Sequence, residues 1–164
     1  MLPKKVEEAL NHQIREEFYS SYLYLAMAAY FEDKSLNGFA TWMKEQAREE
    51  VGHAMRIFNY VTDRRGRVIL EAIPQPTTNF SSVQEVFEKA LEHEQYITGK
   101  INELYALSVE EKDYPTQVML QWFITEQVEE ESTVEAILER VRLIGDHQPA
   151  LILLDRELAA RQSG

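Results

Sequence analysis

The sequence of 164 residues contains no cysteine. This absence excludes disulfide frameworks, zinc ribbons and iron sites built from cysteine. No apolar run reaches the roughly 18 residues that a membrane-spanning helix needs, and no apolar signal segment follows the first residues, Met1-Leu2-Pro3. We therefore expect a cytoplasmic protein that has no membrane partner.

Basic residues are outnumbered, with 17 Lys and Arg against 28 Asp and Glu, so the net charge is −11. A surface of this kind repels the phosphates of nucleic acids and of anionic lipids, and it attracts cations. We expect no nucleic-acid partner. Acidic chains are common, however, and charge by itself favours metal handling only slightly.

Glycine and proline are also scarce, with six and five residues. The apolar residues, 45% of the chain, follow helical spacing almost throughout. This pattern predicts an all-α protein with one domain over residues 1–164. The expected helices are four long ones and a short fifth: 5–34, 38–65, 82–110, 114–143 and 148–161.

The helix ends carry recognisable local signals. Gly66 follows Arg65 where the second helix should end, and a glycine there can take the left-handed conformation. Ser81 and Gln84 have the spacing of a capping box at the start of the third helix. Pro115 suits the first turn of the fourth, where its missing N–H costs little. The predicted boundaries therefore have physical causes.

The segment 66–81 is much longer than the other two loops, and it contains Pro74 and Pro76. Its 16 residues could extend about 50 Å, whereas a helix of 28 residues is about 42 Å long. The segment can therefore run the whole length of a bundle, which would make the second and third helices parallel. The short loops make two helical hairpins.

Each of the four long predicted helices has an apolar stripe that polar residues interrupt near its middle. The interrupting residues are Glu17, Glu50, His53, Glu94, Gln127 and Glu130. A buried carboxylate without a partner costs several kcal/mol. A side chain turned to solvent would explain one interruption, but four at matching depth indicate a shared cation. Oxygen and imidazole ligands suit iron.

An internal register supports this interpretation. Adding 77 to the residue number takes Glu17 to Glu94, Glu50 to Gln127 and His53 to Glu130. The two hairpins therefore resemble halves related by an approximate two-fold axis. Within the second helix, Glu50-x-x-His53 places two ligands on one face. Alone, this motif is weak evidence for a metal site, because it occurs by chance in many helices. It becomes strong evidence when it lies on a core stripe opposite Glu17, Glu94 and Glu130.

The sequence resembles the bacterial and archaeal non-haem ferritins over essentially its whole length. The segments that carry the resemblance are 10–24, 49–55, 92–94, 121–131 and 154–158. The resemblance implies a ferritin-like up-down four-helix bundle with one long crossover and a short C-terminal helix. It also implies iron storage and detoxification in a hollow homo-oligomeric shell of 24 subunits, with Fe²⁺ and dioxygen as substrates.

The resemblance further implies a ferroxidase centre of two iron sites. Glu17, Glu50 and His53 match the ligands of the first site. Glu50 would bridge to the second site, which adds Glu94 and Glu130. The first site should bind more tightly, because only it has an imidazole ligand.

Other residues match auxiliary roles in the same family. Gln127 matches a residue beside the second site that helps to hold oxygen species, and Tyr24 a tyrosine beside the di-iron centre. Trp122 matches an aromatic residue that donates an electron, although simple packing is an alternative. A possible third iron site would use Glu49, Glu126, Glu129 and Glu130. From sequence alone, the first three of these could equally be surface residues.

Departures from related families narrow the prediction. Bacterioferritins have a second E-x-x-H motif and a haem-binding methionine, where this chain has Gln127, Glu130 and Val51. We therefore expect no haem. The alternative function is a non-storage di-iron oxidoreductase, such as a rubrerythrin-like peroxidase, but the cysteine-containing iron domain of rubrerythrins is absent. His12, His93 and His147 lie off the stripes and should be exposed.

Overall fold

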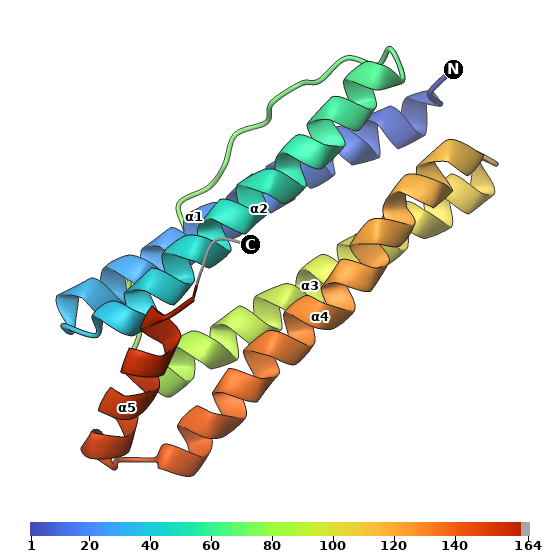
Figure 1. The fold of residues 1–164 in the computed structure, drawn as a ribbon. Coiled ribbons are helices and arrows are strands. Elements are labelled where there is room, and N and C mark those ends of the chain that lie inside the picture. Colours follow the sequence, from blue (N-terminus) through green and yellow to red (C-terminus); the bar gives the residue numbers. More distant parts are fainter. Residues whose placement is uncertain (162–164) are drawn as a thin grey trace.

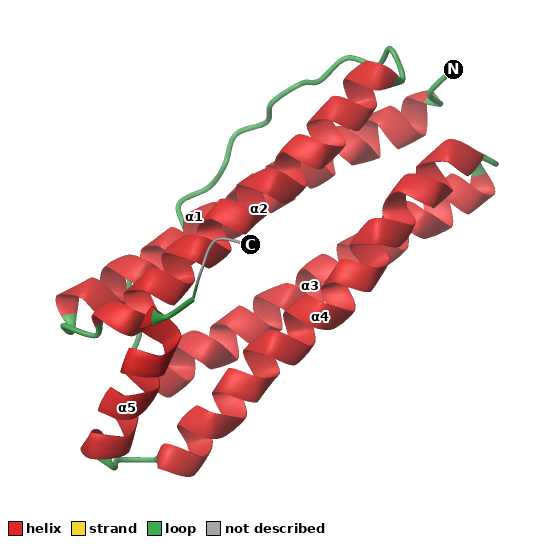
Figure 2. Cartoon of the chain, in the orientation of Figure 1, coloured by secondary structure: helices red, strands yellow, loops and turns green. Residues whose placement is uncertain are grey.

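Five helices account for most of the computed structural model, which describes residues 1–161 (Figure 1). They are α1 (Lys4–Asp33), α2 (Asn37–Asp63), α3 (Val83–Glu110), α4 (Tyr114–Ile144) and α5 (Gln148–Ala159). Within the described residues the rest is loop and turn (Figure 2). The predicted all-α fold is confirmed, and the predicted helix ends agree with these bounds to within two residues.

The first four helices form two antiparallel hairpins, α1–α2 and α3–α4, that lie along one another (Figure 1). Residues 64–82 return along the first hairpin without regular secondary structure, so α2 and α3 run in the same direction. This is the predicted up-down bundle with a single long crossover. None of the helices within residues 1–161 is both long and apolar enough to cross a bilayer.

The cap of α3 corrects one prediction by one residue. Ser82, not Ser81, is the N-cap, and its hydroxyl accepts a hydrogen bond from the Glu85 backbone N–H. Ser81 donates its backbone N–H to the Glu85 carboxylate at 2.7 Å. Because the carboxylate of Glu85 accepts a hydrogen bond from Ser81, the acidic partner in this cap is Glu85 and not Gln84.

The end of α2 corrects a second prediction. The left-handed residue is Arg65, with φ of 61°, and not Gly66. A Cβ on Gly66 would nevertheless lie 2.9 Å from Leu2 Cδ2 and 3.1 Å from the Val61 carbonyl oxygen. Glycine is therefore required here by close packing against the N-terminus and α2, rather than by its backbone dihedrals.

The short helix α5 packs mainly on α2, at the end of the bundle that holds the α1–α2 loop. Leu154 and Leu158 are buried there, and Asp155 Oδ1 accepts a hydrogen bond from the Phe39 backbone N–H at 2.9 Å. A Cβ on Gly38 would come within 1.7 Å of the Asp155 carbonyl oxygen. The position of α5 thus depends on a residue without a side chain.

The hydrophobic core is divided into two clusters. One lies toward α5 and includes the stacked rings of Phe31 and Phe39, whose centroids are 5.0 Å apart. The other lies toward the N-terminus and includes Ile57 and Phe123. The residues between them are buried and polar. The packing of the two clusters therefore fixes a polar band across the middle of the bundle.

Candidate metal centre

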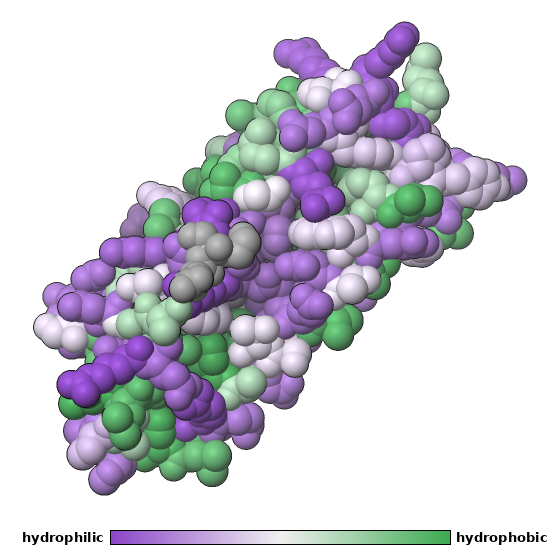
Figure 3. Space-filling model, viewed as in Figure 1, coloured by the Kyte–Doolittle hydropathy of each residue, from purple (hydrophilic) through white to green (hydrophobic). Residues whose placement is uncertain are grey.

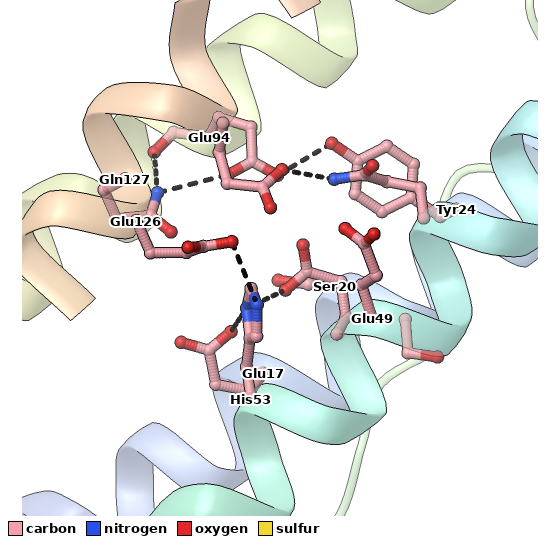
Figure 4. A network of polar contacts seen from close by, with 12 residues as sticks. Glu17, Ser20, Tyr24, Glu49, His53, Glu94, Glu126 and Gln127 are labelled. Carbon is pink, nitrogen blue, oxygen red and sulfur yellow. Dashed lines mark hydrogen bonds and ion pairs between the residues drawn. The ribbon is translucent and has the colours of Figure 1, made fainter. Parts of the chain in front are cut away.

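The polar band brings together all six side chains that the sequence pattern selected. They are Glu17 from α1, Glu50 and His53 from α2, Glu94 from α3, and Gln127 and Glu130 from α4. None of the six is more than 6% exposed. Figure 4 shows Glu94 and Gln127 on one side of the centre, facing His53 and Glu17 on the other. Helical periodicity aims each of them inward.

Two overlapping triads of these residues could hold metal ions. Glu17, Glu50 and His53 offer ligand atoms that lie within 4.8 Å of one another, and so do Glu50, Glu94 and Glu130. Glu50 belongs to both triads, so its carboxylate lies between the two positions. Carboxylate oxygens and an imidazole nitrogen form a donor set that suits iron.

Three buried polar atoms in the first triad lack hydrogen-bond partners: Glu17 Oε2, Glu50 Oε1 and His53 Nδ1. The His53 nitrogen lies 3.2 Å from Glu50 Oε2 and 3.9 Å from Glu17 Oε2 without the geometry of a hydrogen bond. Buried polar atoms are nearly always paired in folded proteins. One cation among these atoms would satisfy all three, so the residues fit a metal ion.

Burial also disfavours the ionised carboxylates. Loss of water raises the pKa of Glu17, Glu50 and Glu94, and the charge of Glu50 adds to the effect on Glu17. The pKa of Glu130 rises to about 8, first through burial and then through the charge of Glu94. A bound cation acts in the opposite direction, because it favours the ionised forms. The cluster is therefore suited to exchange protons for metal ions.

Hydrogen bonds from two other buried side chains fix Glu94. The Tyr24 hydroxyl donates to Oε1 at 2.7 Å, and Gln127 Nε2 donates to Oε2 at 3.1 Å. Burial raises the pKa of Tyr24, and the nearby Glu94 raises it further. Tyr24 therefore remains a protonated donor, and both oxygens of Glu94 are oriented by neighbours.

Two glutamines, to which the sequence pattern assigned no role, orient the carboxylates of Glu17 and Glu130. Gln13 Nε2 donates to Glu17 Oε1 at 3.1 Å, and Gln46 donates to Glu130. Gln13 precedes Glu17 by four residues and Gln46 precedes Glu50 by four, which places each on the same helix face as a ligand. That spacing was the signal that could have identified them.

The acids expected at a third site surround a more open pocket of about 210 Å³, whose lining includes Glu49, Glu126, Glu129 and Glu130. Glu126 reaches the buried cluster, with Oε1 3.7 Å from His53 Nε2. Together with His53 and Glu130 it forms a third group that could hold a metal ion. Glu49 does not belong to this group and instead forms an ion pair with Arg161 at 3.1 Å.

Two aromatic contacts lie beside the cluster. Trp122 meets the His53 ring edge to face, with centroids 5.3 Å apart. The Arg56 guanidinium carbon also lies 3.8 Å from the centroid of the Trp122 ring. The placement of Trp122 therefore fits both packing and electron donation.

The expected exposure of His93 is wrong, whereas His12 and His147 are exposed as predicted. His93 is partly buried where α3 packs on α1, and its Nε2 lies 2.7 Å from Ser20 Oγ. Burial lowers its pKa to about 4. The apolar stripe of α3 could not predict the burial of His93, because this side chain lies on the flank of α3 that contacts α1.

Comparisons with known proteins agree with this geometry. Residues 7–144 match the family model of the ferritin-like domain. The chain is similar to a bacterial non-heme ferritin of Staphylococcus saprophyticus, with 44% identity over 98% of this chain and 96% of that protein. It is also similar to a closed form of the Archaeoglobus fulgidus ferritin engineered by mutagenesis, with a TM-score of 0.99, 46% identity and full coverage of both chains. An open pore ferritin from the same archaeon has a TM-score of 0.97 and 46% identity over 98% of each chain.

Proposed function

We propose that this chain, which belongs to the ferritin family of iron-storage proteins, is a ferroxidase that oxidises Fe²⁺ with dioxygen at the buried cluster. The observation that carries the proposal is the sharing of Glu50 between two triads that could each hold a metal ion. A shared carboxylate holds two ions close enough to act on one dioxygen molecule. Each Fe²⁺ supplies one electron, so a pair of ions supplies two.

The two positions have different donor sets under this proposal. Glu17, Glu50 and His53 bind one ion, and Glu50, Glu94 and Glu130 bind the other. The first set includes a neutral imidazole, whereas the second consists of carboxylates alone. Anionic oxygen ligands stabilise the higher charge of Fe³⁺, which favours oxidation at both positions.

Tyr24 and Gln127 would act by positioning the second set. Both donate hydrogen bonds to Glu94, and Gln127 also contacts the Thr98 hydroxyl at 3.2 Å. Donors of this kind fix the orientation of a ligand carboxylate. In this arrangement the amide N–H of Gln127 donates to the proposed ligand Glu94. To help hold oxygen species, which is the other role expected of it, the Gln127 side chain would take a different orientation.

The third iron site is proposed at the open pocket, which Glu126 and Glu129 both line and from which Glu126 reaches His53 of the buried cluster. Iron leaving the oxidation centre would meet these carboxylates on its way to storage. Glu126 is 25% exposed, whereas His53 beside it is 6% exposed. The pocket therefore connects the buried centre with the surface.

A hollow shell of 24 subunits is proposed as the storage form. Apolar side chains remain exposed on the single chain, among them Tyr22, Leu25 and Ile73 beside a groove of about 520 Å³ between α1 and the crossover. Leu143 and Leu153 are exposed near α5, where Figure 3 shows apolar side chains gathered at one end of the molecule. Exposed apolar surface of this extent favours contact with other subunits.

One experiment tests the oxidation centre. Fe²⁺ is added in air to the parent and to a Glu50→Ala/Glu130→Ala variant, and the appearance of ferric absorbance is followed. The variant should oxidise iron at least tenfold more slowly, because the first triad loses one ligand and the second loses two. A Glu8→Ala/Glu110→Ala control removes two exposed carboxylates and should match the parent.

The outcome has two independent parts. If the cluster variant oxidises iron as fast as the parent, the site assignment is wrong. The mass of the native particle tests the shell separately, and a particle of one or two subunits that holds only a few iron ions would contradict it.

A further inference from the structure

Arg161, which follows α5, lies against α2 and makes three separate contacts there. One guanidinium nitrogen donates to the Trp42 carbonyl oxygen at 3.1 Å, and the other lies 3.1 Å from Glu49 Oε1. The guanidinium carbon is 4.6 Å from the centroid of the Trp42 ring. The Arg161 backbone N–H also bonds to the Leu158 carbonyl oxygen. Its side chain is therefore held by α2, and its backbone is held by α5.

This place is the lining of the open acidic pocket. The pocket is surrounded by Gln46, Glu49, Glu126, Glu129, Glu130, Thr133 and Arg161. Among these described residues, Arg161 alone carries a positive charge at neutral pH. The pocket therefore already contains a cation that the chain supplies.

We propose that Arg161 is a tethered competitor for metal ions, which holds Glu49 and must move away before that carboxylate can bind a metal ion in the pocket. The inference rests on the proposed function and adds control of the outer pocket to it. A divalent ion near Glu126 and Glu129 is repelled by the guanidinium, and Glu49 cannot turn toward the ion while it is paired. Iron is then held weakly in the pocket, which favours onward transfer.

A purely structural role would have Arg161 fasten the end of α5 to Trp42. Removal of Arg161 would then lower thermal stability and leave metal affinity unchanged. Competition makes the opposite prediction, because metal affinity rises when the competing charge is removed. Affinity for a redox-inert ion therefore separates the two roles.

The test measures Zn²⁺ binding by calorimetry in a Glu17→Gln/Glu94→Gln background, which weakens both buried triads and leaves the outer pocket intact. Adding Arg161→Gln should tighten Zn²⁺ binding by roughly three- to tenfold, as expected for loss of one partly exposed competing charge. Arg161→Lys should give a smaller gain, since lysine keeps the charge and loses the forked contact. Arg156→Gln removes an exposed charge from α5 and should change affinity less than twofold.

A third substitution shows whether Glu49 mediates the effect. With Glu49→Gln present, Arg161→Gln should produce a smaller gain, because only the direct repulsion between the guanidinium and the ion is then removed. The proposal is overturned if the Glu17→Gln/Glu94→Gln protein binds Zn²⁺ equally well with and without Arg161→Gln. It is also overturned if Arg156→Gln gives the same gain as Arg161→Gln. Because no iron is oxidised in this assay, its failure is distinguishable from failure of the proposed ferroxidase activity.

Discussion

The Tyr24 hydroxyl donates a hydrogen bond of 2.7 Å to Glu94 Oε1. Both side chains are buried, at 1% exposed each, and they come from different hairpins. The bond therefore links α1 to a proposed metal ligand on α3. A hydrogen bond to a buried carboxylate is stronger than one between neutral groups.

Tyr24→Phe tests this link without changing the size of the core side chain. The variant should bind its second divalent ion about 10- to 100-fold more weakly, the usual cost of removing an outer partner of a ligand. Anaerobic Fe²⁺ titration measures the effect. Tyr114→Phe alters an exposed tyrosine and should behave as the parent. Unchanged affinity in Tyr24→Phe would show that Glu94 is oriented by other contacts.

Glu50→Gln should stabilise the metal-free protein and reduce the additional stability that metal binding gives. In the metal-free protein it removes a carboxyl group whose pKa is raised by burial, so the free energy of unfolding at neutral pH should rise by roughly 1–3 kcal/mol. The parent should gain about 2.7 kcal/mol when Zn²⁺ is present at 100 times its Kd, and the variant much less.

Urea unfolding in chelator and in excess Zn²⁺ measures both effects. Glu110→Gln, an exposed control, should change stability by less than about 0.5 kcal/mol under either condition. The idea fails if Glu50→Gln responds to Zn²⁺ as strongly as the parent does.

The stability of the metal-free protein should depend on pH through Glu130. Its pKa in the folded protein is raised to about 8, above the pKa of about 4.3 expected in the unfolded chain. A raised pKa gives stability that is fully present below the unfolded value and is lost as pH rises through the folded value. The urea concentration at the midpoint of unfolding should therefore decrease as the pH is raised from 5 to 9.

The Glu130→Gln variant should show a flatter pH profile, since glutamine does not titrate. Saturating Zn²⁺ should flatten the profile of the parent as well, because a bound cation favours the ionised carboxylate. Equal slopes in parent and variant would place the pH dependence elsewhere in the chain.

Gly38→Ala tests the docking of α5. The added Cβ would overlap the Asp155 carbonyl, so the free energy of unfolding should fall by about 1–3 kcal/mol as α5 shifts. Gly99→Ala on α3 is the matched control, because nothing lies within 4 Å of its Cβ. It should stabilise the chain by about 0.5–1 kcal/mol. Thermal unfolding of both variants distinguishes a packing clash from the loss of glycine itself.

The sequence predicted the four long helices and the inward position of Glu17, Glu50, His53, Glu94 and Glu130, because both depend on helical periodicity. A residue on the apolar stripe must point to the core whatever its neighbours are. The repeat of 77 residues takes Glu17 of the first hairpin to Glu94 of the second, and both side chains lie in the buried cluster.

Details that depend on contacts between helices could not be predicted in this way. Gln46 reaches Glu130 on α4, and Arg161 reaches Glu49 from the far end of the chain. Such contacts need the packing of the helices and the side-chain rotamers. At the α3 cap, Ser81 and Ser82 are equivalent by residue type, and only the direction of the incoming chain selects Ser82.

The two triads differ in how they connect the molecule. Glu17, Glu50 and His53 all belong to the α1–α2 hairpin, whereas Glu50, Glu94 and Glu130 span α2, α3 and α4. An ion in the first triad would therefore link the two helices of one hairpin. An ion in the second triad would link the two hairpins to each other at the polar band between the apolar clusters. A metal ion at the second position would therefore add a link between the two hairpins that an ion at the first position would not add.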